Sequence, residues 1–145
     1  MIWTLLATAC SGLFAGAATY VNLVEHPARL ESGQVAALAE FRPSYRRGTG
    51  MQASLALASA ALGCVSWLEN RDPLVLIATI LIGSVIPYTF IVVFPVNKLL
   101  LDPELQGLSP ETVRLLRRWA ALHAVRTLLS LCAFFTFLIE LSRHP

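Results

Sequence analysis

Polar side chains in the last apolar stretch of the chain have the types and the spacing to do chemistry. They recur every three or four residues, at Trp119, His123, Arg126 and Ser130. At 100° per residue, side chains with this spacing share one narrow face of a helix. A neutral imidazole can take a proton from an activated carbon or a phenol, and a guanidinium can stabilise the anion that forms. The spacing therefore predicts a general base and an anion-stabilising group on one helix face.

A second polar group ends the first apolar stretch and occupies one side of the expected helix: Asn22, Glu25, His26 and Arg29. If the long connections share one side of the membrane, both polar groups lie at the same end of the molecule. His26 is then expected to approach His123, and Glu25 to be available to Arg126. The prediction is a pocket between four helices, polar at its mouth and apolar below.

Nine residues of this pocket are given roles. His123 is the first choice as base, His26 is the second, and Arg126 is the anion stabiliser. The other six are expected to bind the substrate: Trp119, Tyr88, Asn97, Glu25, Arg29 and Gln52. Gln52 opens the second apolar stretch and Asn97 follows the third, both at the level of the two polar groups. Tyr88 lies about 13 Å deeper than Asn97 along a helix.

Each of these residues also has a structural explanation. Arg126 could reach the membrane interface, because helical side chains lean toward the N-terminus. Trp119 could be an interfacial anchor, and His123 a core residue with satisfied hydrogen bonds. The first expectation is that no cofactor is needed. The alternative is a metal or haem held by His26, His123 and Glu25, a two-histidine, one-carboxylate set suited to iron or copper.

The composition indicates an integral membrane protein. Of the 145 residues, 56% are hydrophobic and 14% are charged, and the mean hydropathy is +0.65. Because about 20 apolar helical residues cross a bilayer, four spans are expected: Ile2–Val24, Met51–Leu68, Leu74–Val96 and Trp119–Leu141. Strands of a membrane barrel would alternate polar and apolar residues, and these stretches do not. The predicted fold is all-α, a single transmembrane domain over residues 1–145 folded as a four-helix bundle.

The positive charges are distributed unequally along the chain. The two long connections carry eight, whereas the short connection and the C-terminal segment carry two: Arg29, Arg42, Arg46, Arg47, Lys98, Arg114, Arg117 and Arg118, against Arg71 and Arg143. Cytosolic loops of membrane proteins carry the excess of lysine and arginine. Both termini are therefore predicted to be non-cytosolic. Because the arginines follow this rule and form no basic stripe, no nucleic-acid partner is expected.

Prolines and caps predict where the helices end. Pro27 is expected to end or kink the first helix and to move His26 out of helical geometry. Residues 32–43 are expected to form a short interfacial helix between spans one and two. Pro95 is expected to close the third span. Residues 109–111 read as a helix start, because serine caps, proline suits the first position and an acid suits the first turn.

Three segments together resemble the anthrone oxygenase-like family of small four-helix membrane proteins. They are Gly16–Arg29 with His26-Pro27-x-Arg29, the Asn97-Lys98-x-Leu100 segment, and Trp119-x-x-x-His123-x-x-Arg126. The likeness covers nearly the whole chain. It implies four transmembrane helices. For some fungal members of the family it also implies oxygenation of an anthrone to an anthraquinone without an organic cofactor.

Two functions follow as competing expectations. The first is an oxidoreductase or oxygenase that acts on a lipophilic phenolic, anthrone or quinone-like small molecule, whose carbanion would meet dioxygen directly. The second is a non-enzymatic binding, transport or scaffold protein for a small lipophilic or anionic molecule. Pro87 in the middle of the third span resembles the broken helices of transporters. Because four helices lack the inverted repeat of most carriers, this second function would need a homodimer.

Overall fold

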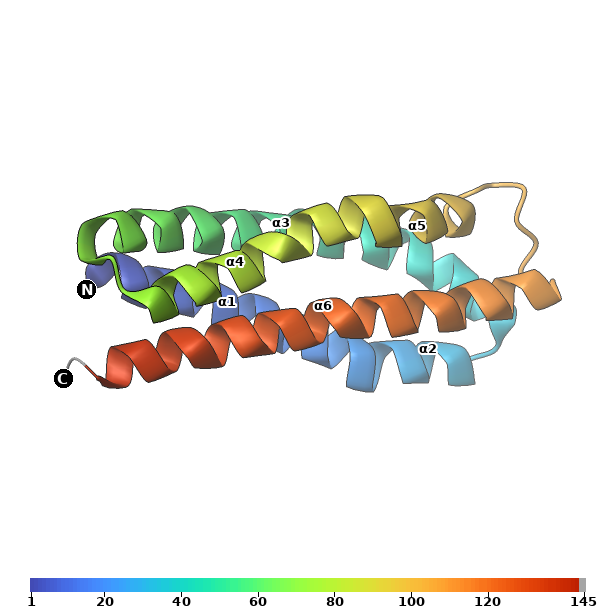
Figure 1. Ribbon diagram of the computed structural model, residues 1–145. Coiled ribbons are helices and arrows are strands. Elements are labelled where there is room, and N and C mark those ends of the chain that lie inside the picture. Colours follow the sequence, from blue (N-terminus) through green and yellow to red (C-terminus); the bar gives the residue numbers. More distant parts are fainter. Residues whose placement is uncertain (144–145) are drawn as a thin grey trace.

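The computed structural model describes residues 1–143, which form four long helical rods (Figure 1). In chain order these are α1 (Ile2–Tyr20), the π-helical segment η1 (Val21–Glu25) and α2 (His26–Glu31); α3 (Gln34–Asn70); α4 (Pro73–Tyr88), the π-helical segment η2 (Thr89–Val93) and α5 (Phe94–Leu100); and α6 (Pro110–Ser142). Each rod is long and apolar enough to cross a membrane. The prediction of an all-α integral membrane protein with four spanning helices is confirmed.

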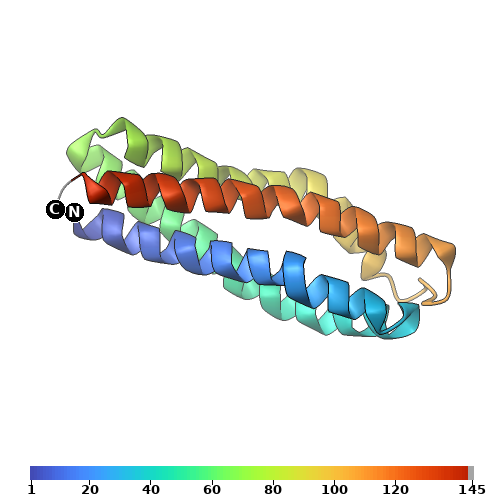
Figure 2. The same ribbon diagram turned by 90° about the horizontal axis from the view of Figure 1, so that it is seen from below.

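The four rods pack in a ring. α1 packs on α3 and on α6, and α4 packs on the same two helices from the other side. The start of α1 and the end of α6 lie together at one end of the bundle, which we call the terminal end (Figures 1 and 2). α2, the first turns of α3 and the connection between α5 and α6 lie at the other end, which we call the loop end (Figure 1).

Capping contacts fix the starts of α6 and α4, and the predicted helix start at Ser109 is confirmed. The side chain of Ser109 accepts a hydrogen bond from the backbone N–H of Glu111 at 3.1 Å. The side chain of Asp72 accepts one from the backbone N–H of Leu74 at 2.7 Å. Each contact satisfies an N–H group that has no partner within the helix. α6 then runs unbroken to Ser142, so the polar residues of the last span are carried by one continuous helix.

The first and third rods continue past their prolines, contrary to prediction. His26 keeps helical backbone angles (φ −69°, ψ −42°), so the expectation that Pro27 displaces it is wrong. Pro95 does not close the third rod, which continues to Leu100. Each proline lies in the first turn of a new α-helix, directly after a π-helical segment. A proline is tolerated there because N–H groups of a first turn have no intrahelical partner to lose.

The short interfacial helix predicted between spans one and two is not a separate element. Its residues are the first turns of α3, a single helix of 37 residues that contains Pro43. Pro43 leaves the carbonyl of Ala39, four residues earlier, without its helical hydrogen bond. Because Ala39 is exposed at the loop end, water or lipid headgroups can bond that carbonyl, and the helix passes the proline.

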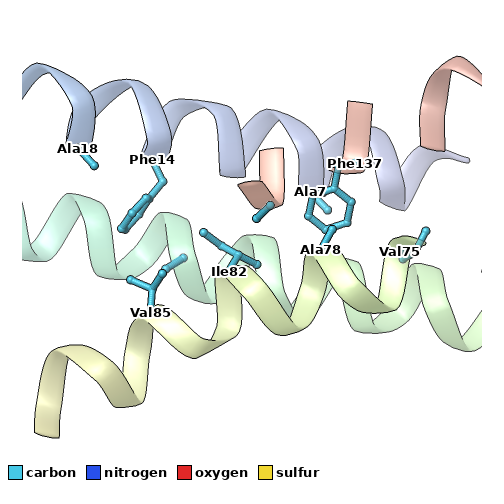
Figure 3. Close-up of a cluster of buried hydrophobic side chains, with 10 residues drawn as sticks. Ala7, Phe14, Ala18, Val75, Ala78, Ile82, Val85 and Phe137 are labelled. Atoms are coloured by element: carbon cyan, nitrogen blue, oxygen red, sulfur yellow. The ribbon is translucent and has the colours of Figure 1, made fainter. Parts of the chain in front are cut away.

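A cluster of buried apolar side chains holds the helices together (Figure 3). Phe14 of α1, Ile82 of α4 and Phe137 of α6 are fully buried in it, among alanines that let the helices approach. Among the glycines, Gly63 of α3 has the closest contact with neighbouring helices. A Cβ atom at Gly63 would clash with the Thr79 hydroxyl and lie 3.2 Å from the Phe137 ring. This contact holds α3 against α4 and α6.

Gly63→Ala is expected to destabilise the bundle by about 1–3 kcal/mol, because the added methyl group overpacks this contact. Gly50→Ala, in the same helix, is the matched control, since a Cβ there meets nothing within 4 Å. Replacing that helical glycine is expected to stabilise by about 0.5–1 kcal/mol. Thermal unfolding of both variants in detergent micelles measures the difference. Equal unfolding midpoints would contradict the packing around Gly63.

Candidate functional site

A pocket of about 580 Å³ lies in the half of the bundle toward the loop end. Its walls come from α1, η1, α2, α3 and α6. Six of the nine predicted site residues line it: Glu25, Arg29, Gln52, Trp119, His123 and Arg126. His26, Tyr88 and Asn97 are not among the lining residues. The polar end of the first span and the polar face of the last span therefore meet at one cavity.

A hydrogen bond from η1 fixes the orientation and tautomer of His123. Its Nδ1 lies 2.6 Å from Oδ1 of Asn22. The Asn22 amide is itself oriented, because its Nδ2 donates to the Ala120 carbonyl at 3.1 Å and its Oδ1 accepts from the Thr127 hydroxyl at 2.7 Å. An amide oxygen can only accept, so neutral His123 carries its proton on Nδ1. Within residues 1–143, Nε2 has no hydrogen-bond partner and can accept a proton.

Arg126 brings a positive charge without a counter-ion to the pocket. It is 9% exposed, and its Nη2 donates to Oε1 of Gln52 at 3.0 Å. Its guanidinium carbon lies 5.6 Å from the centre of the Phe14 ring. Its Nε has no hydrogen-bond partner, and no ion pair of residues 1–143 includes it. The guanidinium therefore points into the bundle instead of snorkelling, and it favours an oxyanion in the pocket.

A second cation that lines the pocket, Arg29, is neutralised, whereas a third, Arg47, is exposed at the rim. The Arg29 guanidinium pairs with Glu25, and with Glu40 at 3.2 Å. Ser44 bridges the group, accepting from Arg29 at 3.1 Å and donating to Glu25 at 2.6 Å. The prediction that Glu25 is available to Arg126 is wrong, because Arg29 lies one turn away on the same helix face. This cluster joins α2 to α3 at the loop end of the pocket.

The ring of Trp119 contacts both histidines. Its ring centre is 4.8 Å from that of His123 and 5.2 Å from that of His26. Since Trp119 is only 5% exposed, it is not an interfacial anchor. The two histidines therefore come near each other as expected, each in contact with the same indole ring. His26 does not line the pocket, and its Nδ1 lies 3.4 Å from Nη1 of Arg29, so the geometry favours His123 as the base.

Asn97 and Tyr88 bond to neighbours of the pocket and are not among the residues that line it, so their predicted contact with substrate stays a prediction. Asn97 is fully buried, accepts from the indole N–H of Trp119 at 2.7 Å and donates to the Tyr45 hydroxyl at 3.1 Å. The Tyr88 hydroxyl donates to the Leu122 carbonyl at 3.2 Å. The reason why neither lines the pocket is the position of the third rod. Its polar side chains meet α6 and α3 before they could reach the cavity.

Sequence reasoning missed the aromatic wall of the pocket on α3. Phe41 meets Trp119 edge-on, with ring centres 5.2 Å apart and an interplanar angle of 88°. Tyr45 stacks on Phe41 at 5.7 Å and 13°. Both line the pocket. Their spacing of four residues is the signal that could have identified them, because it places both rings on one helix face.

The metal alternative does not fit these residues. Glu25 is engaged by Arg29 and Ser44, and Nδ1 of His123 by Asn22. Both histidine rings pack against the indole ring of Trp119. Over residues 1–143, no three His, Cys, Asp or Glu side chains are grouped so that they could hold a metal ion.

Asn97→Leu is expected to destabilise the protein by about 1–3 kcal/mol, because it leaves the buried Trp119 N–H and the Tyr45 hydroxyl without a partner. The emission of Trp119 is expected to shift, since its indole N–H loses its acceptor. Thermal unfolding and fluorescence of a Trp3→Phe, Trp67→Phe background, in which Trp119 is the only tryptophan, measure both effects. Asn70→Leu at the exposed end of α3 is the control and should change stability by less than about 0.5 kcal/mol. Unchanged emission in Asn97→Leu would contradict the positioning role.

Comparison with known proteins agrees with the resemblance seen in the sequence. A sequence model of the anthrone oxygenase family matches residues 41–136, from Phe41 in the pocket wall to a point in α6 beyond Arg126. No curated protein and no solved structure matches the chain. The matched segment spans more than half of the chain and includes His123, Arg126 and their aromatic neighbours. The chain therefore belongs to the anthrone oxygenase family.

Proposed function

We propose that this protein is a membrane-embedded oxygenase that acts on a flat, lipophilic phenolic or anthrone-type molecule. One observation carries the proposal: His123, with Nε2 unengaged, and Arg126, with no counter-ion, line the same pocket one helical turn apart. The membership of the family and the four spanning helices support it. A volume of about 580 Å³ also lies within the range of small-molecule sites, about 300–1,000 Å³.

The first step is removal of a proton by His123. The carbon opposite the carbonyl of an anthrone is acidic, because loss of its proton gives an aromatic enolate. Nε2 of His123 accepts this proton, while Nδ1–H stays bonded to Asn22. The imidazolium is thereby held in the orientation of the neutral ring, and a base positioned in this way contributes about 10²–10⁴-fold to such a step.

Arg126 stabilises the enolate oxygen. Its guanidinium has unused donor capacity, since Nη2 bonds to Gln52 and Nε has no partner. In a buried site, a charge interaction is stronger than in water. The donor is also in place before the reaction, so little reorganisation is needed when the negative charge forms.

Dioxygen is the oxidant in the second step. The enolate carbon forms a C–O bond with dioxygen, and the resulting peroxide takes up the proton held by His123. The O–O bond then breaks, the carbon loses its second hydrogen as a proton, and hydroxide leaves with that proton as water. One anthrone and one dioxygen give one anthraquinone and one water. The substrate supplies all the electrons, so no organic cofactor or external reductant enters the balance.

The position of Pro87 favours this function over transport. Carriers with a broken helix place the break at the binding site. Pro87 lies in α4, and within the described chain no pocket-lining residue comes from α4, η2 or α5. The distribution of positive charge supports an orientation in which the loop end faces the cytosol and both termini face the opposite side. The pocket would then lie in the cytosolic half of the bilayer.

Oxygen uptake by the purified protein in phospholipid vesicles, with anthrone as substrate, tests the proposal. The expected result is one dioxygen consumed per anthraquinone formed, at a rate above spontaneous oxidation in protein-free vesicles. With isotopically labelled dioxygen, one labelled atom should enter the new carbonyl group. Elemental analysis and treatment with a chelator test the expectation that no metal is needed. Protein that binds anthrone but leaves it unoxidised would favour the non-enzymatic alternative.

A further inference from the structure

The pocket has a buried floor and an exposed rim. The floor is formed by the buried side chains of Trp119, His123 and Arg126 of α6. The exposed lining residues come from the neighbouring helices α1 and α3: Gly16, Tyr20, Arg47, Thr49 and Met51. α1 and α3 also pack on each other. The mouth of the pocket therefore lies on the flank of the bundle, between two adjacent spans.

The α1 side of this mouth lies at the depth of the acyl chains. α1 begins at Ile2 at the terminal end, and Gly16 follows about 21 Å further along the helix at 1.5 Å per residue. Because the hydrocarbon core of a bilayer is about 30 Å thick, Gly16 borders lipid tails. Tyr20, one turn later, lies toward the headgroups. A molecule dissolved in the bilayer reaches this mouth without passing through water.

Two glycines at the mouth serve no close helix packing. A Cβ atom added at Gly16 or Gly48 would meet nothing within 4 Å, and both residues line the pocket. Gly12 and Gly63 differ. A Cβ at Gly12 would press on Phe134, and a Cβ at Gly63 would press on Thr79 and Phe137. Small residues in membrane helices usually allow close helix contact. At Gly16 and Gly48 the missing side chain instead leaves space in the mouth.

Arg126 supplies the second observation that points to a ligand. It is more than nine-tenths buried, lines the pocket and has an unpartnered Nε. A buried cation without a counter-ion attracts an electron-rich oxygen. Apart from the exposed Arg47, the rim on α1 and α3 is uncharged, so the two ends of the pocket differ in polarity. A ligand with an oxygen at one edge and an apolar ring body matches this difference.

We propose that the pocket is loaded sideways from the bilayer through the gap between α1 and α3, and that Gly16 and Gly48 determine specificity by keeping this gap wide enough for fused aromatic rings. The ligand enters with its oxygen-bearing edge first, toward Arg126, and its rings follow. The inference rests on the proposed function for the class of ligand. It adds the route of entry and the residues that select by width. A ligand with a single aromatic ring needs less width, so its entry does not depend on the size of the side chains at positions 16 and 48.

Association kinetics without turnover test this route. The protein carries Trp3→Phe and Trp67→Phe, so that quenching of Trp119 reports occupancy, and it is reconstituted in phosphatidylcholine vesicles without oxygen. The probes are anthrone, with three fused rings, and phenol, with one. Gly16→Leu and Gly48→Leu are expected to slow association of anthrone by about tenfold or more, and that of phenol little. Gly50→Leu is the matched control, because its site is equally open but does not line the pocket.

Misfolding is not expected in these variants, because leucine favours a helix more than glycine does. Gly16→Ala and Gly48→Ala provide a graded series. Equal association of anthrone with the parent and both leucine variants would overturn the route, as would equal slowing by Gly50→Leu or absence of quenching in the parent. The proposed function fails separately if the parent binds anthrone but forms no anthraquinone when oxygen is admitted. The route is then still decided by the association rates.

Discussion

Replacing His123 with alanine is expected to lower the kcat for anthrone oxidation by about 10²–10⁴-fold, the contribution of a positioned general base. The variant loses the only imidazole that lines the pocket within residues 1–143. Its KM is expected to change less, because the ring contacts with Trp119 and Phe41 remain. The measurement is the initial rate of oxygen uptake in vesicles at saturating anthrone, after subtraction of the rate in protein-free vesicles.

Three further variants separate a base from a structural residue. His123→Gln fills the site without a basic nitrogen and should lose as much activity as His123→Ala. Asn22→Leu removes the acceptor that fixes the tautomer of His123, and an intermediate loss is expected. His26→Gln should lose less activity, because His26 affects the site only through its packing against Trp119. If His26→Gln lost as much kcat as His123→Ala, the choice of base would be wrong.

The polar face of the last span could be predicted because one uninterrupted helix carries all its members. The capping sequence at Ser109 marks where that helix begins, and after Pro110 in the first turn no proline interrupts it. With the period of 3.6 residues, the relative directions of Trp119, His123 and Arg126 then follow. Burial of a charged residue in a span also predicts that this face points into the bundle. These arguments need no knowledge of the neighbouring helices.

Contacts between rods could not be predicted in the same way. Glu25 was within reach of both Arg29 and Arg126 by depth, and only the rotation of the first rod about its axis decides between them. That rotation depends on η1, because a π-turn has a different number of residues per turn from an α-turn. Hydropathy does not report such a segment. Pro27 and Pro95 were visible, but a proline alone does not show whether a helix ends or restarts.

The orientation of the third rod was missed for the same reason. Asn97 has the depth expected of a pocket residue, yet it faces Trp119 and Tyr45 from outside the cavity. Its amide holds two rings of the aromatic wall, those of Trp119 and Tyr45. Sequence therefore predicted the depth of the polar groups well, whereas their partners required the packed structure.

Arg126→Leu is expected to lower the kcat for anthrone oxidation by about 10²–10³-fold, comparable to loss of one oxyanion-stabilising donor. Thermal stability is expected to stay equal or to rise, because the change removes a buried cation that has no counter-ion. A lower kcat together with an equal or higher thermal stability distinguishes a residue retained for chemistry from one retained for the fold. Oxygen uptake and the unfolding midpoint in detergent, measured on the same preparation, give both quantities.

Two comparisons make this result specific to the charge at the pocket. Arg126→Lys keeps a cation but loses the planar set of donors, so an intermediate rate is expected. Arg71→Asn removes a cation at the terminal end, where Arg71 lies over Trp67, and asparagine tolerates the left-handed backbone at that position (φ 55°). It should leave the rate unchanged. A fall in unfolding midpoint in Arg126→Leu that accounts for its lost activity would instead make Arg126 a structural residue, and the pocket would then have no anion-stabilising group.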